Sequence, residues 1–354
     1  MAKWGSLLMV VTCLFAGCAR QTESTTKKTK PTESTRPSVY VSVAESESSA
    51  SSGNALPDGT NPDPAASSDG TTASEGGVLG ESTKGEGAGG ESAETSAPGG
   101  DYLANLLSLK QQMLDKKDYY NGLDNVAEDT WCFQRKKDHE PSGSYEYFNL
   151  KEYGGYYIND HVPEGDKVVY LTFDCGYPSN RTVNILDTLK KHNVKASFFV
   201  TKMYLEECSD YAIRMKEEGH MVCNHTVNHK DLTVMEVEDI ISEIFDVAQY
   251  FYEKTGYEID PYFRTPTGSY TKRVMQMIKD AGYTTLFWSL AYDDYDQNNQ
   301  PAPGFIIDHF QKFHHNGAVI LMHNDSSSNE RDLDEVLTYL EGEGYRFGLL
   351  DEIA

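Results

Sequence analysis

The sequence predicts an α/β protein with a parallel sheet of about seven strands, closed or nearly closed, behind a disordered N-terminal segment. Two observations favour this fold class. From Lys167 onward, short apolar runs rich in β-branched and aromatic residues alternate with segments of helical spacing. Several helical segments also end at a glycine, as helices often do: Gly219, Gly256, Gly282, Gly317 and Gly344. The alternation indicates one βα-repeated domain over residues 167–354.

The first 18 residues have the pattern of an export signal. Lys3 supplies a positive start, and the apolar core that follows is too short to span a bilayer as a mature helix. The end of this segment resembles a bacterial lipoprotein signal, in which Cys18 is lipidated and anchors the protein to a membrane. Phe15 is unusual in that pattern, so ordinary cleavage is the alternative. Either route exports the protein, and lipidation would hold it at the outer face of the cytoplasmic membrane.

Residues 19–100 consist mainly of Ser, Thr, Glu, Gly, Pro and Ala. Such a segment cannot bury enough apolar surface to offset its ordering entropy, so we expect a disordered linker that lets the folded part reach into the cell wall. Residues 101–166 follow as an extension with one helix over Tyr102–Asp118 and dense aromatics over Tyr145–Tyr157. We expect these aromatics to pack on the domain, with a sugar-stacking platform as the alternative.

The repeated domain contains seven candidate strands and six candidate helices. The expected strands are Val168–Asp174, Ala196–Thr201, Met221–His225, Tyr262–Arg264, Thr284–Ser289, Ala318–His323 and Phe347–Leu350. The expected helices are Thr182–His192, Ser209–Glu218, Val234–Thr255, Arg273–Ala281, Pro303–Phe313 and Asp332–Glu343.

The charge and cysteine content exclude several classes of protein. A formal net charge of −24 over 354 residues, without a basic stripe, argues against a nucleic-acid partner. The six cysteines are scattered and none forms a CxxC pair, so neither a disulfide scaffold nor a zinc finger is expected.

Titratable side chains gather where the predicted strands end, which is how a barrel-like α/β fold builds an active site. Asp174 closes the first strand, and by itself such a residue is usually a cap or turn residue. His225 and His229 form an HxxxH pair that follows another strand. On a helical turn the two imidazoles would share one face and grip a divalent cation, whereas on an arbitrary helix the pair is usually a surface feature.

Three further charged residues complete the set. Arg264 precedes a rigid turn, where its guanidinium either keeps a carboxylate ionised or forms a surface salt bridge. One of Asp293 and Asp294 is expected at a strand mouth. His323 ends an apolar run and is either a core residue or a general acid or base held by a carboxylate.

Five stretches in this order resemble the polysaccharide deacetylase family (carbohydrate esterase family 4, the NodB homology domain): Val168–Tyr177, Asn224–His229, Phe263–Gly268, Trp288–Tyr295 and Leu321–His323. The resemblance implies a distorted, incomplete (β/α) barrel and metal-dependent hydrolysis of N-acetyl groups. It implies Asp174 as catalytic base, Arg264 as its partner, His323 as general acid, and Asp294 as the group that orients His323. It further implies His225 and His229 as ligands of a divalent metal, with zinc expected.

The same resemblance suggests a substrate pocket. Leu321 would line the acetyl pocket, backbone near Thr267 would supply an oxyanion donor, and Tyr295 stands where the family usually has Trp, as part of the pocket wall. Gly154–Tyr157, Thr172–Asp174 and Phe287–Tyr292 are closest to the de-N-acetylases of spore formers. Those enzymes make muramic δ-lactam in spore-cortex peptidoglycan by acting on N-acetylmuramic acid after an amidase has removed the stem peptide.

Cys175 departs from the family, which usually has a metal-ligating Asp at this position. Three interpretations stay open: a thiolate ligand that completes the metal site with His225 and His229, a disulfide with Cys223, or a passive small residue. Two other functions also stay open. The enzyme could act on N-acetylglucosamine of peptidoglycan or a chitin-like glycan, or the protein could be a silent wall-binding protein. A monomer that contacts a peptidoglycan strand is expected.

Overall fold

The computed structural model describes residues 100–127 and 130–353. The predicted export signal, its Cys18 and the predicted linker up to residue 99 lie outside the described residues. Among the helices that the structure describes, none has the length and apolar character needed to cross a membrane.

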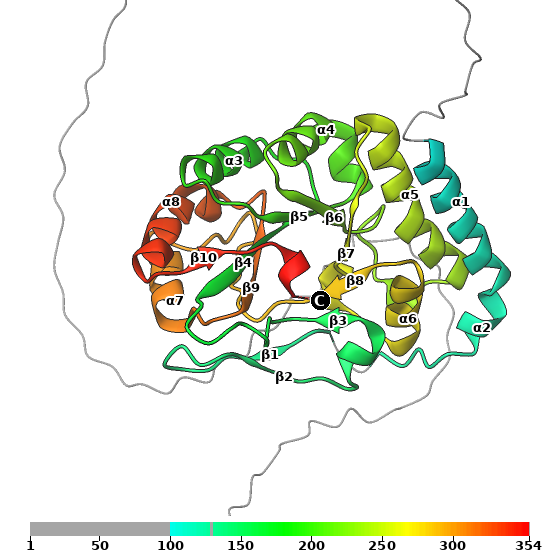
Figure 1. Ribbon diagram of the computed structural model, residues 1–354, viewed down its shortest axis with the longest axis horizontal. Coiled ribbons are helices and arrows are strands. Elements are labelled where there is room, and N and C mark those ends of the chain that lie inside the picture. The colour runs from blue at the N-terminus through cyan, green and yellow to red at the C-terminus, as the bar shows by residue number, and fades with distance from the viewer. Residues whose placement is uncertain (1–99, 128–129, 354) are drawn as a thin grey trace, which may run out of the picture. The chain divides into compact units, whose positions relative to one another are not determined.

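The domain is built on one sheet in which every strand pair is parallel (Figure 1). Its strands are β3 (Gly155–Tyr156), β4 (Val168–Cys175), β5 (Ser197–Val200), β6 (Met221–Asn224), β7 (Asp260–Phe263), β8 (Thr284–Leu286), β9 (Ala318–His323) and β10 (Arg346–Phe347). The order is β10-β4-β5-β6-β7-β8-β3, and β9 pairs with β4. Beyond β8 the chain returns to β9, where Leu290 bridges Ile320 and Ser289 donates from its backbone to Val319. The strands therefore form an incomplete barrel, which confirms the predicted fold class.

Strand β4 pairs with β5, β9 and β10, and all eight of its residues are buried. Successive side chains of a strand point to opposite faces. Val168 and Tyr170 accordingly pack inside the barrel with Phe199 and Leu286. The alternate residues Val169, Leu171, Phe173 and Cys175 belong to the larger apolar cluster beneath the outer helices. Apolar residues at every position are what a strand covered on both faces requires.

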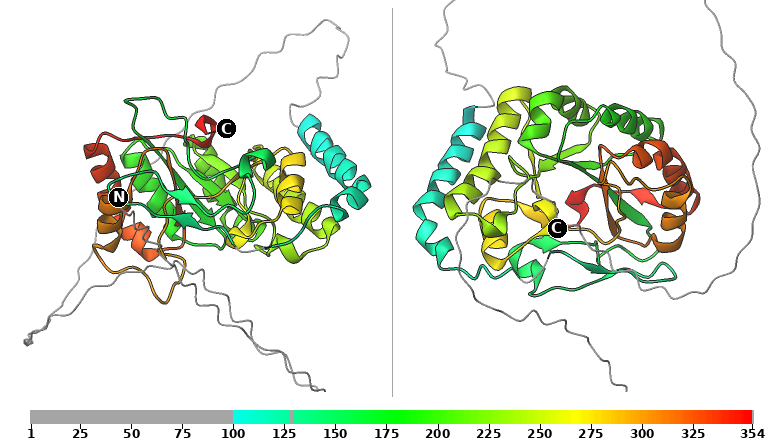
Figure 2. Two further views of the ribbon diagram at one scale, coloured as in Figure 1. Left: turned by 90° about the horizontal axis from the view of Figure 1, so that it is seen from below. Right: turned by 180° about the vertical axis from the view of Figure 1, so that it is seen from behind.

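Six helices cover the outside of the sheet: α3 (Arg181–Lys191), α4 (Lys202–Glu217), α5 (Val237–Thr255), α6 (Lys272–Asp280), α7 (Phe305–Phe313) and α8 (Ser327–Gly342). Figure 2 shows this ring from behind. Short 3₁₀ turns occur at η1 (Leu150–Tyr153), η2 (Leu232–Val234), η3 (Pro266–Gly268) and η4 (Leu350–Glu352). Leu350 and Ile353 pack against Val168 at the start of β4, so the C-terminal segment covers the end of the barrel opposite the carboxyl ends of the strands.

The extension before the barrel contains α1 (Gly100–Asp115), α2 (Lys117–Asn121) and a small hairpin of β1 (Phe133–Gln134) and β2 (Gly143–Ser144). Helix α1 runs beside α5, as Figures 1 and 2 show, and Lys110 forms an ion pair with Asp246 there. The extension contributes Trp131 and, from its aromatic segment, Leu150 to an apolar cluster with Phe287, Trp288 and Leu321.

All seven predicted strands are present, with ends that differ by a few residues. The eighth, β3, was not predicted because two residues carry no periodicity. Helix α4 begins at Lys202 rather than Ser209, since Thr201 caps it by accepting from the backbone of Tyr204. The predicted strand over Phe347–Leu350 pairs only at its start, and Leu350 begins η4.

Candidate active site

Asp174 and Arg264 form a buried ion pair at the carboxyl end of the sheet. Arg264 Nη1 donates to Asp174 Oδ1 at 2.7 Å, and no part of the Arg264 side chain is exposed. Its Nε donates to the carbonyl of Leu286 at 2.9 Å, and its guanidinium lies 4.1 Å from the ring centre of Phe199. Burial by itself would raise the pKa of Asp174, but the guanidinium outweighs it and holds that pKa below its usual value. Asp174 is therefore ionised, and its Oδ1 is held in place by the hydrogen bond from Arg264.

The other oxygen of this carboxylate faces His225. His225 Nε2 lies 3.5 Å from Asp174 Oδ2, and no hydrogen-bond partner reaches this buried nitrogen among the described residues. The opposite ring nitrogen, Nδ1, lies 2.8 Å from the carbonyl oxygen of Arg264 and must donate to it. That bond leaves the lone pair on Nε2, and burial lowers the pKa of His225, so the ring is neutral. This is the form in which histidine binds a metal ion.

His229 lies next to His225, with ring centres 4.8 Å apart. The segment between them is not the helical turn on which the sequence argument relied. Instead Thr226 and His229 have positive φ angles of 74° and 51°, a conformation that costs free energy in a β-branched residue such as Thr226. The two imidazoles are thus brought together by a strained loop.

Glu243 of helix α5 holds this loop. Its Oε2 accepts from the backbone nitrogens of Val227 and Asn228 at 2.8 Å each, and its Oε1 accepts from the Asn228 side chain at 2.7 Å. Glu243 is only 4% exposed. Three hydrogen bonds to one buried carboxylate provide the interaction energy that offsets the strain in the loop.

His323 ends β9 and is paired in register with Asp174 on the neighbouring strand. Its Nδ1 lies 2.7 Å from Oδ1 of Asp294, whose side chain is fully buried. Burial by itself lowers the pKa of His323, but Asp294 and then Asp174 outweigh that effect and raise the pKa to about 9. His323 is therefore an imidazolium at neutral pH. Of the two predicted carboxylates it is Asp294, and not the exposed Asp293, that reaches the strand mouth.

Asn329 is a part of this site that the sequence argument missed. Its Nδ2 donates to Asp294 Oδ2 at 2.5 Å and to the carbonyl of His323 at 3.1 Å, while Tyr292 donates to its Oδ1 at 2.8 Å. Asn329 lies in the first turn of α8, beyond all five motifs. The sequence contained one indication of this role. Asn329 follows His323 by six residues and lies close to the start of α8, which Ser326 caps, so it could lie near the site.

The three predicted pocket residues lie around this centre. Leu321, 8% exposed, points from β9 into the cluster with Trp131 and Trp288. Tyr295 is 36% exposed, and its ring meets His323 edge-on at 6.1 Å. Thr267 occupies a turn with a positive φ of 58°, and its hydroxyl donates to the carbonyl of Pro266. Leu321 lies within β9, Thr267 follows β7 and Tyr295 follows β8, and the carboxyl ends of these strands meet at the site.

Comparison with known proteins identifies this arrangement. The polysaccharide deacetylase family pattern matches residues 161–286. The chain is 36% identical over 225 residues to Bacillus subtilis PdaA, which is named a peptidoglycan-N-acetylmuramic acid deacetylase. The aligned residues cover 63% of this chain and 84% of that protein. The chain belongs to the polysaccharide deacetylase family. The solved structure of that PdaA, described as a family 4 carbohydrate esterase, agrees with a TM-score of 0.61 at 35% identity, and covers 65% of this chain and 98% of that one. A Bacillus cereus peptidoglycan-N-acetylglucosamine deacetylase is 32% identical over 200 residues, covering 56% of this chain and 92% of that protein.

In this polysaccharide deacetylase, Cys175 and Cys223 lie on opposite faces of the sheet. Cys175 and Cys223 are both free thiols, so the predicted disulfide alternative is wrong. The physical reason is the strand register. Cys223 packs inside the barrel beside Phe199, whereas Cys175 points to the outer cluster, and strand β5 separates β4 from β6.

The same placement bears on Cys175 as a metal ligand. Its thiol is fully buried, and burial raises its pKa well above the usual value, so it is held as a neutral thiol. Asp174, one residue earlier, points to the opposite face of the sheet from Cys175. No group of three metal-binding side chains that includes this thiol occurs among the residues the structure describes. The geometry therefore favours the interpretation of Cys175 as a small packing residue.

Proposed function

We propose that this polysaccharide deacetylase removes the acetyl group from N-acetylmuramic acid in peptidoglycan, which leaves an amine able to close into the muramic δ-lactam of spore cortex. The main support for this chemistry comes from two charged pairs, one with an ionised carboxylate on β4 and one with a protonated histidine on the adjacent strand β9. Asp174 with Arg264 is a carboxylate at neutral pH, and His323 with Asp294 is an imidazolium on the adjacent strand. Similarity to the B. subtilis N-acetylmuramic acid deacetylase supports the choice of sugar.

Each pair has one role in the hydrolysis. Asp174 takes a proton from the attacking water while Arg264 keeps its carboxylate ionised between turnovers. The water oxygen bonds to the acetamide carbon, the carbon–nitrogen bond breaks, and His323 gives its proton to the departing amine nitrogen. Acetate and the amino sugar are the products. Asp294 holds Nδ1 of His323, so the proton available for transfer is the one on Nε2.

His225 and His229 would hold a divalent metal, on which members of this family generally depend. The fit rests on the unpartnered, deprotonated Nε2 of His225 and on the adjacent ring of His229. Zinc suits imidazole ligands. When bound, such an ion polarises the acetamide carbonyl.

The pocket residues would fix the acetyl group. Leu321 offers an apolar wall for its methyl, and Tyr295 borders His323 at the mouth. Gly268 and Ser269 donate their backbone nitrogens within the turn, so the backbone nitrogen of Thr267 would face the carbonyl oxygen as charge develops on it.

The proposal extends to where the enzyme works. We infer an exported lipoprotein anchored through Cys18, acting as a monomer in the cell wall after an amidase has removed stem peptides. Peptidoglycan-acting relatives support a cell-wall location.

One experiment separates the sugars. The full chain, supplied with zinc, is incubated with intact peptidoglycan and with peptide-stripped glycan, and the digested fragments are analysed by mass spectrometry. We expect acetyl loss from muramic residues of the stripped glycan. Loss from glucosamine residues alone would assign the N-acetylglucosamine activity instead, and no loss from either substrate would contradict both and favour a wall-binding protein.

A further inference from the structure

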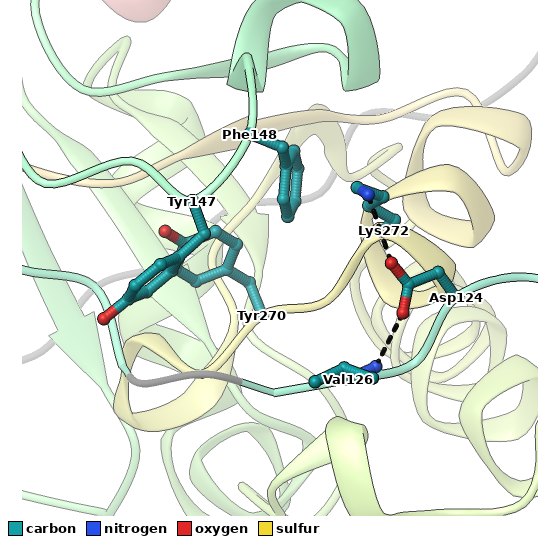
Figure 3. Close-up of a pocket in the computed structure, with 6 residues that line it drawn as sticks. All are labelled: Asp124, Val126, Tyr147, Phe148, Tyr270 and Lys272. Carbon is teal, nitrogen blue, oxygen red and sulfur yellow. Dashed lines mark hydrogen bonds and ion pairs between the residues drawn. The ribbon is translucent and has the colours of Figure 1, made fainter.

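A groove outside the catalytic motifs lies at the junction of the N-terminal extension and the loop that follows β7. It is lined by Asp124, Val126, Tyr147, Phe148, Tyr270 and Lys272 (Figure 3). Four of these residues come from the extension and precede residue 161, where the match to the family pattern begins. We call these six residues the extension groove.

The extension groove combines aromatic surface with charge. Phe148 and Tyr270 have ring centres 5.5 Å apart, Tyr147 and Tyr270 have ring centres 6.2 Å apart, and Lys272 Nζ lies 5.8 Å from the Phe148 ring centre. Figure 3 shows Asp124 beside Lys272, which donates to it at 3.1 Å. Tyr147 is 43% exposed although Tyr270 beneath it is only 2% exposed. The exposed ring of Tyr147 offers apolar surface on which a ligand can pack.

This mixture fits a sugar ring better than a lipid. The C–H face of a pyranose packs on an aromatic ring, and its hydroxyls hydrogen-bond to charged groups at the edge. The ion pair of Lys272 and Asp124 places a donor and an acceptor there. A purely apolar ligand would leave both charges without hydration, which disfavours it.

The extension groove is linked to the candidate active site through the segment from Thr267 to Tyr270. Tyr270 follows Thr267 by three residues, a span of about 10 Å at most. The hydroxyls of Thr267 and Ser269 lie 2.9 Å apart, and the backbone of Trp131 donates to the carbonyl of Gly268 at 2.7 Å. Tyr270 also belongs to the same apolar cluster as Leu321. The extension groove therefore lies within a few residues of the turn to which the oxyanion donor was assigned, a separation that neighbouring sugars of one glycan strand can span.

We propose that the extension groove is a binding subsite for a sugar of the glycan strand, beyond the sugar that loses its acetyl group, with Tyr147 as its stacking surface. This inference rests on the proposed function for the chemical nature of the strand. Within the same extension, Tyr147 is 43% exposed, whereas Trp131 and Leu150 are buried.

The test measures how binding depends on glycan length. The full chain carrying His323→Ala, which should turn over slowly enough for binding to be measured, is titrated with a peptide-free disaccharide and a peptide-free octasaccharide of alternating N-acetylglucosamine and N-acetylmuramic acid. Adding Tyr147→Ala should weaken octasaccharide binding about 5- to 10-fold, the size of one lost aromatic contact, and leave disaccharide binding unchanged. Tyr147→Phe, which keeps the ring, should retain octasaccharide affinity.

Tyr145 provides the matched control, because it is 55% exposed, two residues away, and outside the groove. Tyr145→Ala should leave both affinities unchanged. The subsite is refuted if Tyr147→Ala binds the octasaccharide as its parent does, if Tyr145→Ala loses as much, or if Tyr147→Phe loses as much as Tyr147→Ala. The dependence of affinity on glycan length is measured by binding alone. Its outcome is therefore independent of whether the wild-type enzyme releases acetate from muramic acid.

Discussion

His323 and Asp294 are joined by two bonds that involve different atoms of the histidine. The ring Nδ1 lies 2.7 Å from Oδ1 of Asp294, and the backbone nitrogen of His323 donates to Oδ2 at 2.8 Å. The backbone bond persists whether or not the ring is protonated. The carboxylate therefore stays in place through a catalytic cycle, and the ring keeps its orientation when it gives up a proton.

The first prediction concerns the pH dependence of this pair. Because the pKa of His323 is raised to about 9, the general acid is charged at neutral pH and is lost as pH rises through about 9. Asp294→Asn removes the charge that raises this pKa and leaves the burial that lowers it. The alkaline limb of the kcat profile should move to lower pH, whereas Asp293→Asn, at the exposed neighbouring position, should leave it in place. A profile unchanged in Asp294→Asn would assign the limb to another group.

A second prediction concerns direct loss of the acid or base. His323→Ala and Asp174→Asn should each lower kcat about 10²- to 10⁴-fold, the usual contribution of a positioned proton donor or acceptor. Circular dichroism should show both variants folded. Acetate release at the wild-type rate by either one would place the proton transfers elsewhere.

A third prediction concerns stability at the buried ion pair. Arg264→Met leaves Asp174 buried without its cation and should lower the free energy of unfolding by about 3–5 kcal/mol at pH 7. The double variant with Asp174→Asn should recover part of that loss, because the uncompensated charge is gone. The lowered pKa of Asp174 means that the wild-type pair stabilises the fold above the unfolded-state pKa of this group and stops doing so as pH falls through its folded-state pKa. Urea unfolding measures each value, and equal losses in the single and double variants would contradict this account.

A fourth prediction concerns the loop of the two histidines. Glu243→Ala removes three hydrogen bonds that hold the strained segment around Thr226, and should weaken zinc binding about 10- to 100-fold. Glu238 lies on the same helix but is paired with Lys117 at the surface, so Glu238→Ala serves as the control. Calorimetric titration with zinc compares the two variants. Equal affinities would show that the loop keeps its conformation without the hydrogen bonds to Glu243.

A fifth prediction separates the roles of Cys175 and His225. Cys175→Ser should keep the zinc content of wild type, because the thiol faces the outer cluster, whereas His225→Ala should lose the metal. Elemental analysis of the purified variants gives the stoichiometry. Loss of zinc from Cys175→Ser would restore the interpretation of this cysteine as a thiolate ligand.

The sequence by itself determined the barrel and most of the residues at its mouth. Strand runs such as Val168–Asp174 and Ala318–His323 are predictable because a strand buried on both faces must be apolar throughout. The carboxyl ends of parallel strands then meet at one edge. Asp174, His225, Arg264 and His323 could therefore be assigned to one site from local patterns and motif order alone.

Only the tertiary structure decided how those residues are paired and held. The tautomer of His225 depends on the carbonyl of Arg264, and the geometry of its loop depends on Glu243, both distant in sequence. The support of Asp294 by Asn329 depends on where α8 returns to the sheet. The direction of Cys175 depends on strand register, in which a shift of one residue reverses the face of every side chain. These are long-range contacts, and hydrophobic periodicity and local motifs contain no information about which distant partner a side chain will meet.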